Sequence, residues 1–167
     1  MATMEIDETA LDGMTMQSFA ASALFDRTFE EGMSLVEEAA RYFDGRGRDE
    51  ARALPGQTAM LYSSESLRVT TRLMQAASWL LVQRAVQEGD MPPEDAVSER
   101  YRLGSKEICF GGRADDALSL PKMLQTLLAR SESLYRRIAR LEQVLLRGEK
   151  SDDVRTHFER LEQAFGP

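Results

Sequence analysis

The sequence contains few of the residues that bind metals or act as catalytic nucleophiles. Its 167 residues include one cysteine, Cys109, and one histidine, His157. A zinc site needs several such ligands together, and the metal sites of helical bundles use Glu-x-x-His on two helices. One thiol cannot form an internal disulfide, which is typical of a reducing cytosol. The composition therefore predicts a cytoplasmic protein without a metal, a cofactor or an enzymatic active site.

The sequence also lacks long apolar runs and an excess of basic residues. Apolar runs such as Trp79–Val82 are far shorter than the roughly 20 residues that span a bilayer. Residues 1–14 do not have the basic and then apolar regions of a signal peptide. The net charge of −7 disfavours binding to a polyphosphate or to an anionic membrane. We expect neither nucleic acid nor a membrane as a partner.

No segment has the strict alternation of a strand, whereas long segments have apolar residues at steps of four and three, the spacing of one helix face. These segments cover about residues 17–43, 58–88 and 120–147. They predict an all-α fold, an antiparallel three-helix bundle that forms one domain over residues 1–147. A long, partly ordered connection, residues 89–118, precedes the third helix. Asp44-Gly45 is expected to end the first helix and Gly148 the third.

The charged residues are divided between the first and third helices. Acidic residues fall off the apolar stripe of the first helix, as is typical of a solvated face: Asp26, Glu30, Glu31, Glu37 and Glu38. The third helix is rich in arginine: Arg130, Arg136, Arg137, Arg140 and Arg147. We expect these arginines to pair with the acidic first helix, while docking of a basic partner on the acidic face is the alternative.

The middle segment carries more than one row of residues at helical spacing. One row is Met60, Leu67, Met74, Leu81 and Ala85, and a second is Tyr62, Ser66, Val69, Leu73, Ala76 and Leu80. Because both rows are mostly apolar, we expect them to face the other two helices.

A third row in the middle segment changes from charged to apolar along its length: Arg68, Arg72, Gln75, Trp79, Val82 and Val86. A purely solvated face would not end in tryptophan and valine. Either the connection over residues 89–118 folds back over Trp79 and Val86, or the row is an exposed intermolecular contact. The second interpretation makes these residues candidates for dimerisation or partner binding, because interfaces concentrate binding energy in Trp and Arg.

Beyond Gly148 the sequence predicts a flexible amphipathic C-terminal tail, residues 148–167. Its apolar residues are spaced 4, 3 and 4: Val154, Phe158, Leu161 and Phe165. The stretch is too short to be stable as an isolated helix. It either docks on its own bundle or folds against a partner, for which these four residues are the candidate contacts.

The middle segment resembles a known family. The stretch YSSESLRVTTRLMQAASWLLVQRAVQEGDM at Tyr62–Met91, followed by RYRLG at Arg100–Gly104, is similar to the small alphaproteobacterial proteins named for regulation of CtrA degradation. The acidic, Phe-rich first helix and the arginine-rich third helix agree with this family in order and length. The resemblance covers about the first 147 residues and identifies no catalytic residue.

The resemblance implies a non-enzymatic adaptor in cell-cycle proteolysis. Such proteins are three-helix bundles that form homodimers and help to bring protein cargo to the ClpXP protease, together with a response-regulator-like primer. An adaptor needs surfaces and no active site, because it acts by raising the effective concentration of cargo beside the protease. A helical dimerisation, scaffold or chaperone-like module without a protease link is the competing interpretation, and an enzyme is a distant third.

Overall fold

The computed structural model describes residues 13–112 and 114–165, and every regular element in these ranges is helical. The all-α fold class is therefore confirmed. The elements are α1 (Met16–Ala20), α2 (Ala23–Asp44), α3 (Arg46–Arg52), α4 (Gly56–Glu88), α5 (Pro93–Ala96), η1 (Glu99–Tyr101), α6 (Lys106–Cys109), η2 (Ala117–Ser119) and α7 (Lys122–Phe165). None of the helices in the described ranges has the length and apolarity needed to span a membrane.

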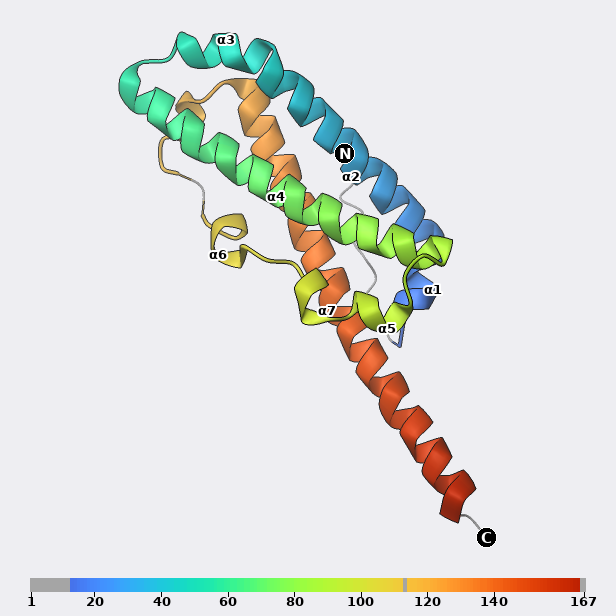
Figure 1. The fold of residues 1–167 in the computed structure, drawn as a ribbon. Coiled ribbons are helices and arrows are strands. Elements are labelled where there is room, and N and C mark those ends of the chain that lie inside the picture. Colours follow the sequence, from blue (N-terminus) through green and yellow to red (C-terminus); the bar gives the residue numbers. More distant parts are fainter. Residues whose placement is uncertain (1–12, 113, 166–167) are drawn as a thin grey trace.

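The three long helices α2, α4 and α7 contact one another and surround the core (Figure 1). Helix α2 runs antiparallel to both of its neighbours (Figure 1), and its Gly32 lies beside Leu80 of α4 and Leu134 of α7. Helices α4 and α7 run in the same direction (Figure 1), so the fully antiparallel arrangement predicted from the sequence is wrong for this pair. Two parallel helices need a long connection between them, and residues 89–121 return the chain to the starting end of α4.

The predicted first helix is divided at its N-terminal end. The Ser22 hydroxyl accepts a hydrogen bond from the backbone amide of Phe25 and caps α2, so α1 is a separate short helix. Helix α1 packs against α4, where the Phe19 ring lies 5.7 Å from the ring of Trp79. Helix α2 ends at Asp44, as predicted, and the expected loop after it contains α3.

Of the two rows of α4 that were expected in the core, one is buried and the other is exposed. Tyr62, Val69, Leu73, Ala76 and Leu80 of the second row are buried. The first row was predicted wrongly. Its large side chains are exposed by more than half: Met60 76%, Leu67 61%, Met74 64% and Leu81 53%.

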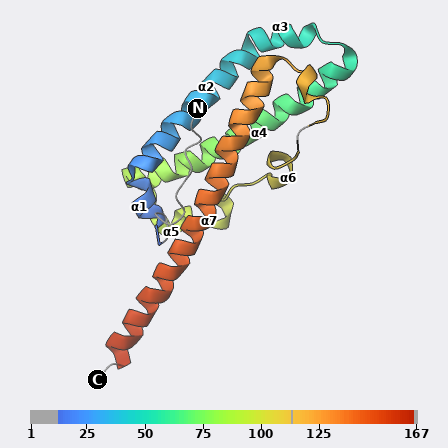
Figure 2. The ribbon, with the colours of Figure 1, turned by 180° about the vertical axis from the view of Figure 1, so that it is seen from behind.

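Helix α7 does not end at Gly148 but continues to Phe165. Gly148 is buried where the chain at Gly13 and Met14 crosses α7, and a Cβ atom at position 148 would collide with the Met14 carbonyl. A glycine is required here for close approach rather than as a stop. Beyond this crossing α7 extends away from the other helices, as both views show (Figures 1 and 2).

Ion pairs join α7 to α2 through two of the five arginines that were predicted to form them. Arg130 donates to the Glu38 carboxylate at 2.6 Å, and Arg137 pairs with Glu31. Both contacts lie on the antiparallel α2–α7 pair. The arginines therefore contribute to helix pairing within the chain, at the modest energies of partly exposed ion pairs.

Candidate functional site

The row of α4 that was predicted as an exposed contact lies beneath other parts of the same chain. Arg72, Trp79 and Val86 are buried, while Arg68, Gln75 and Val82 are half-buried. The connection before α7 and helix α1 cover them, so the exposure on which that prediction depended is wrong. The alternative is observed in part: the connection covers the polar half of the row and, through Ala96, Val86, whereas α1 lies against Trp79 and also contacts Val86.

The polar half of this row holds the connection in place. Arg72 Nε donates to the Cys109 carbonyl at 2.9 Å and Nη1 donates to the Leu128 carbonyl of α7 at 3.2 Å. Arg68 Nη1 donates to the carbonyls of Gly111 and Gly112. Gln75 Oε1 accepts from the Gly104 amide at 2.8 Å. The backbone of the connection thus supplies hydrogen-bond partners for polar side chains that would otherwise be costly to bury.

The apolar half of the row is covered from the other side. Trp79 contacts Phe19 of α1, and Val86 packs with Ala20 of α1 and Ala96 of α5. Neither side chain is available to a partner in this arrangement.

The connection is also fixed to α7. The Leu103 amide donates to the Glu142 carboxylate at 2.7 Å, and the Tyr135 hydroxyl donates to the Gly104 carbonyl at 3.0 Å. Burial raises the pKa of the Cys109 thiol and of the Tyr135 hydroxyl. A buried thiol with a raised pKa is mostly protonated and a poor nucleophile. Within residues 13–112 and 114–165, no group of three or more His, Cys, Asp and Glu residues could hold a metal ion.

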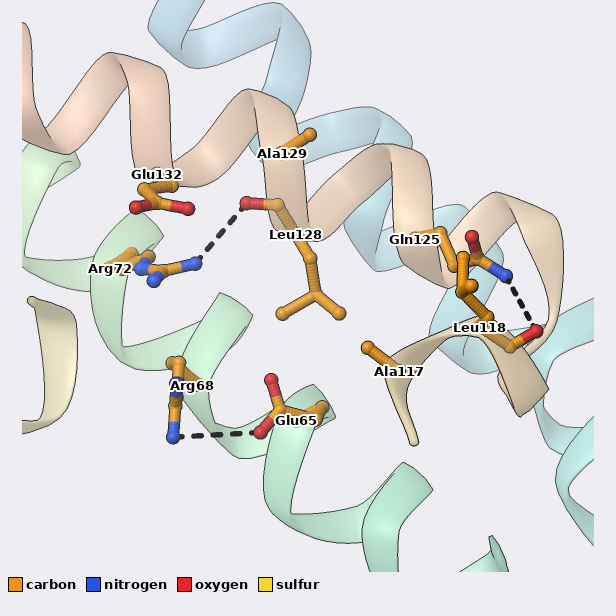
Figure 3. Close-up of a pocket in the computed structure, with 9 residues that line it drawn as sticks. All are labelled: Glu65, Arg68, Arg72, Ala117, Leu118, Gln125, Leu128, Ala129 and Glu132. Carbon is orange, nitrogen blue, oxygen red and sulfur yellow. Dashed lines mark hydrogen bonds and ion pairs between the residues drawn. The ribbon is translucent and has the colours of Figure 1, made fainter. Parts of the chain in front are cut away.

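A cavity of about 120 Å³ remains between α4, η2 and α7, beside the covered row. Figure 3 shows its lining, in which Glu65, Arg68 and Arg72 come from α4 and Glu132 from α7. The remaining lining residues are Ala117, Leu118, Gln125, Leu128 and Ala129. The cavity therefore combines buried charges of both signs with apolar walls.

The exposed side of α4 carries no charged residue from Gln57 to Leu81, and we call it the uncharged face. Its exposed residues are Gln57, Met60, Ser63, Ser64, Leu67, Thr70, Met74, Ser78 and Leu81. The charged residues of this part of α4 are Glu65, Arg68 and Arg72, and all three lie against the connection or α7. Depletion of charge together with exposed Met and Leu is typical of the centre of a protein interface. The uncharged polar residues between the large ones were a signal of this face that the sequence contained.

The predicted apolar ridge at the end of α7 is helical and exposed. Val154, Phe158 and Leu161 are 63%, 65% and 43% exposed. Phe165 is the last residue of the helix, and its side chain lies outside the described part of the structure. The ridge does not dock on its own bundle, which was one of the two interpretations of its sequence.

Comparisons with known proteins identify the family. The family model described as "Protein of unknown function (DUF1465)" matches residues 16–165. The crystal structure of RcdA from Caulobacter crescentus CB15 shares 52% sequence identity with this chain, covers 77% of it and 96% of the RcdA chain, and superposes with a TM-score of 0.64. The chain belongs to the RcdA family. A search of curated proteins finds no match.

Membership of the RcdA family confirms the resemblance inferred from Tyr62–Met91. In this member of the RcdA family, the covered row of α4 is a structural element rather than a free surface. Three regions of the described chain that are open to other molecules are the uncharged face of α4, the cavity beside Glu65 and the exposed ridge of α7.

Proposed function

We propose that this protein is a non-enzymatic adaptor in regulated proteolysis, which helps to deliver cell-cycle regulators to the ClpXP protease with the aid of a response-regulator-like primer. The observation that carries the proposal is the 52% identity to RcdA over 96% of its chain. The family resemblance implies a role in CtrA degradation. Such an adaptor acts in the cytoplasm and raises the local concentration of cargo at the protease.

The surfaces of the molecule suit this role. The end of α7, whose exposed residues form the ridge, extends away from the bundle that contains α4 (Figure 1), so the uncharged face can hold a second copy while the ridge holds a partner. Exposed apolar surface costs solubility and is retained where it is used in recognition.

A homodimer through the uncharged face is the second part of the proposal. Met60, Leu67, Met74 and Leu81 repeat every seven residues over about 32 Å, the spacing of a coiled-coil seam. Small residues stand half a heptad away from them: Ser64, Thr71 and Ser78. In an antiparallel pair of α4 helices, large residues of one copy meet small residues of the other. Such a face is complementary to itself, as a two-fold interface requires.

The ridge of α7 is the proposed contact for a protein partner. Val154, Phe158 and Leu161, continued in the sequence by Phe165, have the i, i+4, i+7 spacing of helices that bind in an apolar groove. Because the ridge is already helical, binding does not require the whole cost of forming a helix.

Degradation of a purified cargo by ClpXP tests the function directly. The cargo is incubated with protease and primer, with and without this protein, and its loss is followed on gels. Faster degradation in the presence of the protein is expected, and the stimulation should saturate with its concentration. An unchanged rate with every candidate cargo would favour a helical scaffold or chaperone-like module without a protease link.

A further inference from the structure

The cavity between α4, η2 and α7 is lined by two buried residues of opposite charge, Glu65 and Arg72. Glu65 is 3% exposed, and its nearest cationic partner, Arg68 Nη2, is 3.5 Å away. The guanidinium of Arg72 is also buried, and its hydrogen bonds go to two backbone carbonyls rather than to a carboxylate. Buried charges are stable only when their hydrogen-bonding capacity is met. An acceptor and a donor therefore face the same small cavity (Figure 3).

The formal charges around the cavity cancel, because two arginines stand against Glu65 and Glu132. A ligand with a net charge would be attracted by one pair of these residues and repelled by the other pair. A neutral group that has both an N–H donor and a carbonyl acceptor fits better. The peptide group is such a group, and it can donate to Glu65 and accept from Arg72.

The rest of the lining is suited to an apolar side chain. Leu128, Ala117 and Ala129 form walls, and Leu118 at the mouth is 87% exposed. The volume of about 120 Å³ approaches the roughly 150 Å³ of an engineered apolar cavity that binds benzene. The space therefore suits one side chain of the size of leucine, methionine or phenylalanine.

We propose that this cavity binds one large apolar side chain of a partner protein, with a neighbouring peptide group of the partner lying between Glu65 and Arg72. The partner is a peptide segment, because every residue of a peptide presents its side chain next to a neutral donor and acceptor. The inference rests on the proposed function for the nature of the partner, a protein. It assigns to an adaptor an anchor site that is separate from both the uncharged face and the ridge of α7.

The test uses blocked amino acids as minimal peptides and the full chain alone. N-acetyl-leucine N-methylamide is titrated into ¹⁵N-labelled protein, and the amide signals of Leu118, Gln125 and Ala129 are followed by NMR. A ligand of this size is expected to bind with a Kd of roughly 1 mM. N-acetyl-glycine N-methylamide lacks the side chain and should bind at least about tenfold more weakly, since burial of leucine contributes that much.

A variant whose cavity is filled by a side chain of its own tests the site, and a matched variant outside the cavity is its control. Ala129→Phe places a ring into the cavity from its exposed wall and should abolish the shifts caused by the leucine probe. Ser133→Phe adds the same ring one turn later, outside the lining, and should leave them unchanged. Circular dichroism checks that both variants remain helical. If Ala129→Phe unfolds, Leu118→Ser at the mouth provides the same comparison, with weaker binding expected.

Three results would overturn the proposal. They are the absence of saturable shifts at the cavity, equal binding of the leucine and glycine probes, and tighter binding of free leucine than of its blocked form, which would mark a free amino acid site. Because these titrations contain no protease or cargo, their failure leaves the result of the degradation assay intact. A failed degradation assay with a positive titration would instead retain the peptide site and reject the adaptor role.

Discussion

Gly148 of α7 lies against the backbone carbonyl of Met14, with no room for a Cβ atom between them. One residue later, the Glu149 carboxylate accepts a hydrogen bond from the Met16 amide at 2.5 Å. These adjacent contacts fix the chain before α1 across α7. They explain how a helix can pass through a glycine, because the glycine creates the space that the crossing chain occupies.

Replacement of Gly148 by alanine tests this crossing. Alanine favours a helix by about 1 kcal/mol over glycine, but overpacking costs about 1–3 kcal/mol. We expect the collision with Met14 to prevail and the melting temperature to fall by a few degrees, at about 2–4 °C per kcal/mol. Gly56→Ala is the control, because nothing lies within 4 Å of its new methyl group. A rise in melting temperature for both variants would show that the crossing is absent in solution.

Helical spacing identified the rows of α4 but not which of them is buried. Leu67 and Leu73 belong to rows of similar polarity, yet Leu73 is buried and Leu67 is exposed. The outcome depends on the connection, whose backbone carbonyls satisfy Arg72 and make burial of a charged row possible. Hydrogen bonds between residues distant in the sequence cannot be deduced from periodicity, because periodicity is a local property.

Predictions from helical spacing were right where two long helices pack on each other. They were wrong where the connection, or the chain that crosses α7 before α1, covers a helix. Two of the five arginines predicted to pair with the acidic face of α2, Arg130 and Arg137, do so, because both lie on a long helix with a defined face. Gly148 was predicted to end the helix because glycine often does so, whereas here the close contact with Met14 explains why the position is a glycine. The cavity was missed because its lining comes from three elements, one of them η2.

Charge introduced on two faces of α4 separates dimerisation from folding. Met74→Glu adds a charge to an exposed position, so the fold should be unchanged within about 0.5 kcal/mol while the dimer dissociates. Trp79→Glu buries an unpaired carboxylate beside Phe19 and should unfold the protein. Light scattering after gel filtration and thermal unfolding distinguish the two effects. Thr126→Glu, an exposed position on α7, is the control for added charge.

A persistent Met74→Glu dimer would remove the uncharged face from the proposal. A folded monomer of Trp79→Glu would restore the original interpretation, in which the row from Arg68 to Val86 is the dimer contact.

Arg72 should control the closure of the connection over α4. Arg72→Met keeps the apolar stem but leaves the Cys109 carbonyl without its donor, whereas the Leu128 carbonyl still accepts from the Ser131 hydroxyl. Each buried carbonyl left unpaired costs about 1–3 kcal/mol. We expect faster amide hydrogen exchange in residues 105–112, with α2 less affected. Arg52→Met, an exposed residue in a surface ion pair, is the control and should exchange like the original protein. Unchanged exchange in Arg72→Met would show that the connection is held by other contacts.

The free energy of unfolding should fall in alkaline solution because of the Cys109 thiol. Burial raises the pKa of this thiol, so the folded state retains a proton that the unfolded chain loses above its ordinary pKa of about 8.5. The stabilising contribution is complete below that pH and is lost as the pH rises through the folded pKa. Urea unfolding between pH 7 and pH 10 measures the effect. Cys109→Ala should have a smaller decrease from pH 8 to pH 10, and an equal decrease would assign the pH dependence to other groups.

Two truncations of α7 separate the structural part of this helix from the part available to a partner. Removal of residues 151–167 deletes the exposed Val154, Phe158 and Leu161 and should change the melting temperature by only a few degrees. Removal of residues 148–167 also deletes Glu149 and its hydrogen bond to Met16, a charged contact of about 1.5–3 kcal/mol. The second truncation should therefore be distinctly less stable than the first.

Both truncations should reduce cargo degradation equally, because both lack the ridge that we propose as a partner contact. Degradation rates measured at a temperature where both variants are folded make this comparison independent of stability. If the shorter truncation destabilised the protein as much as the longer one, the ridge would have to pack on the body in solution. If cargo were degraded at the original rate without residues 151–167, delivery would depend on other surfaces, and the uncharged face of α4 would become the first to test.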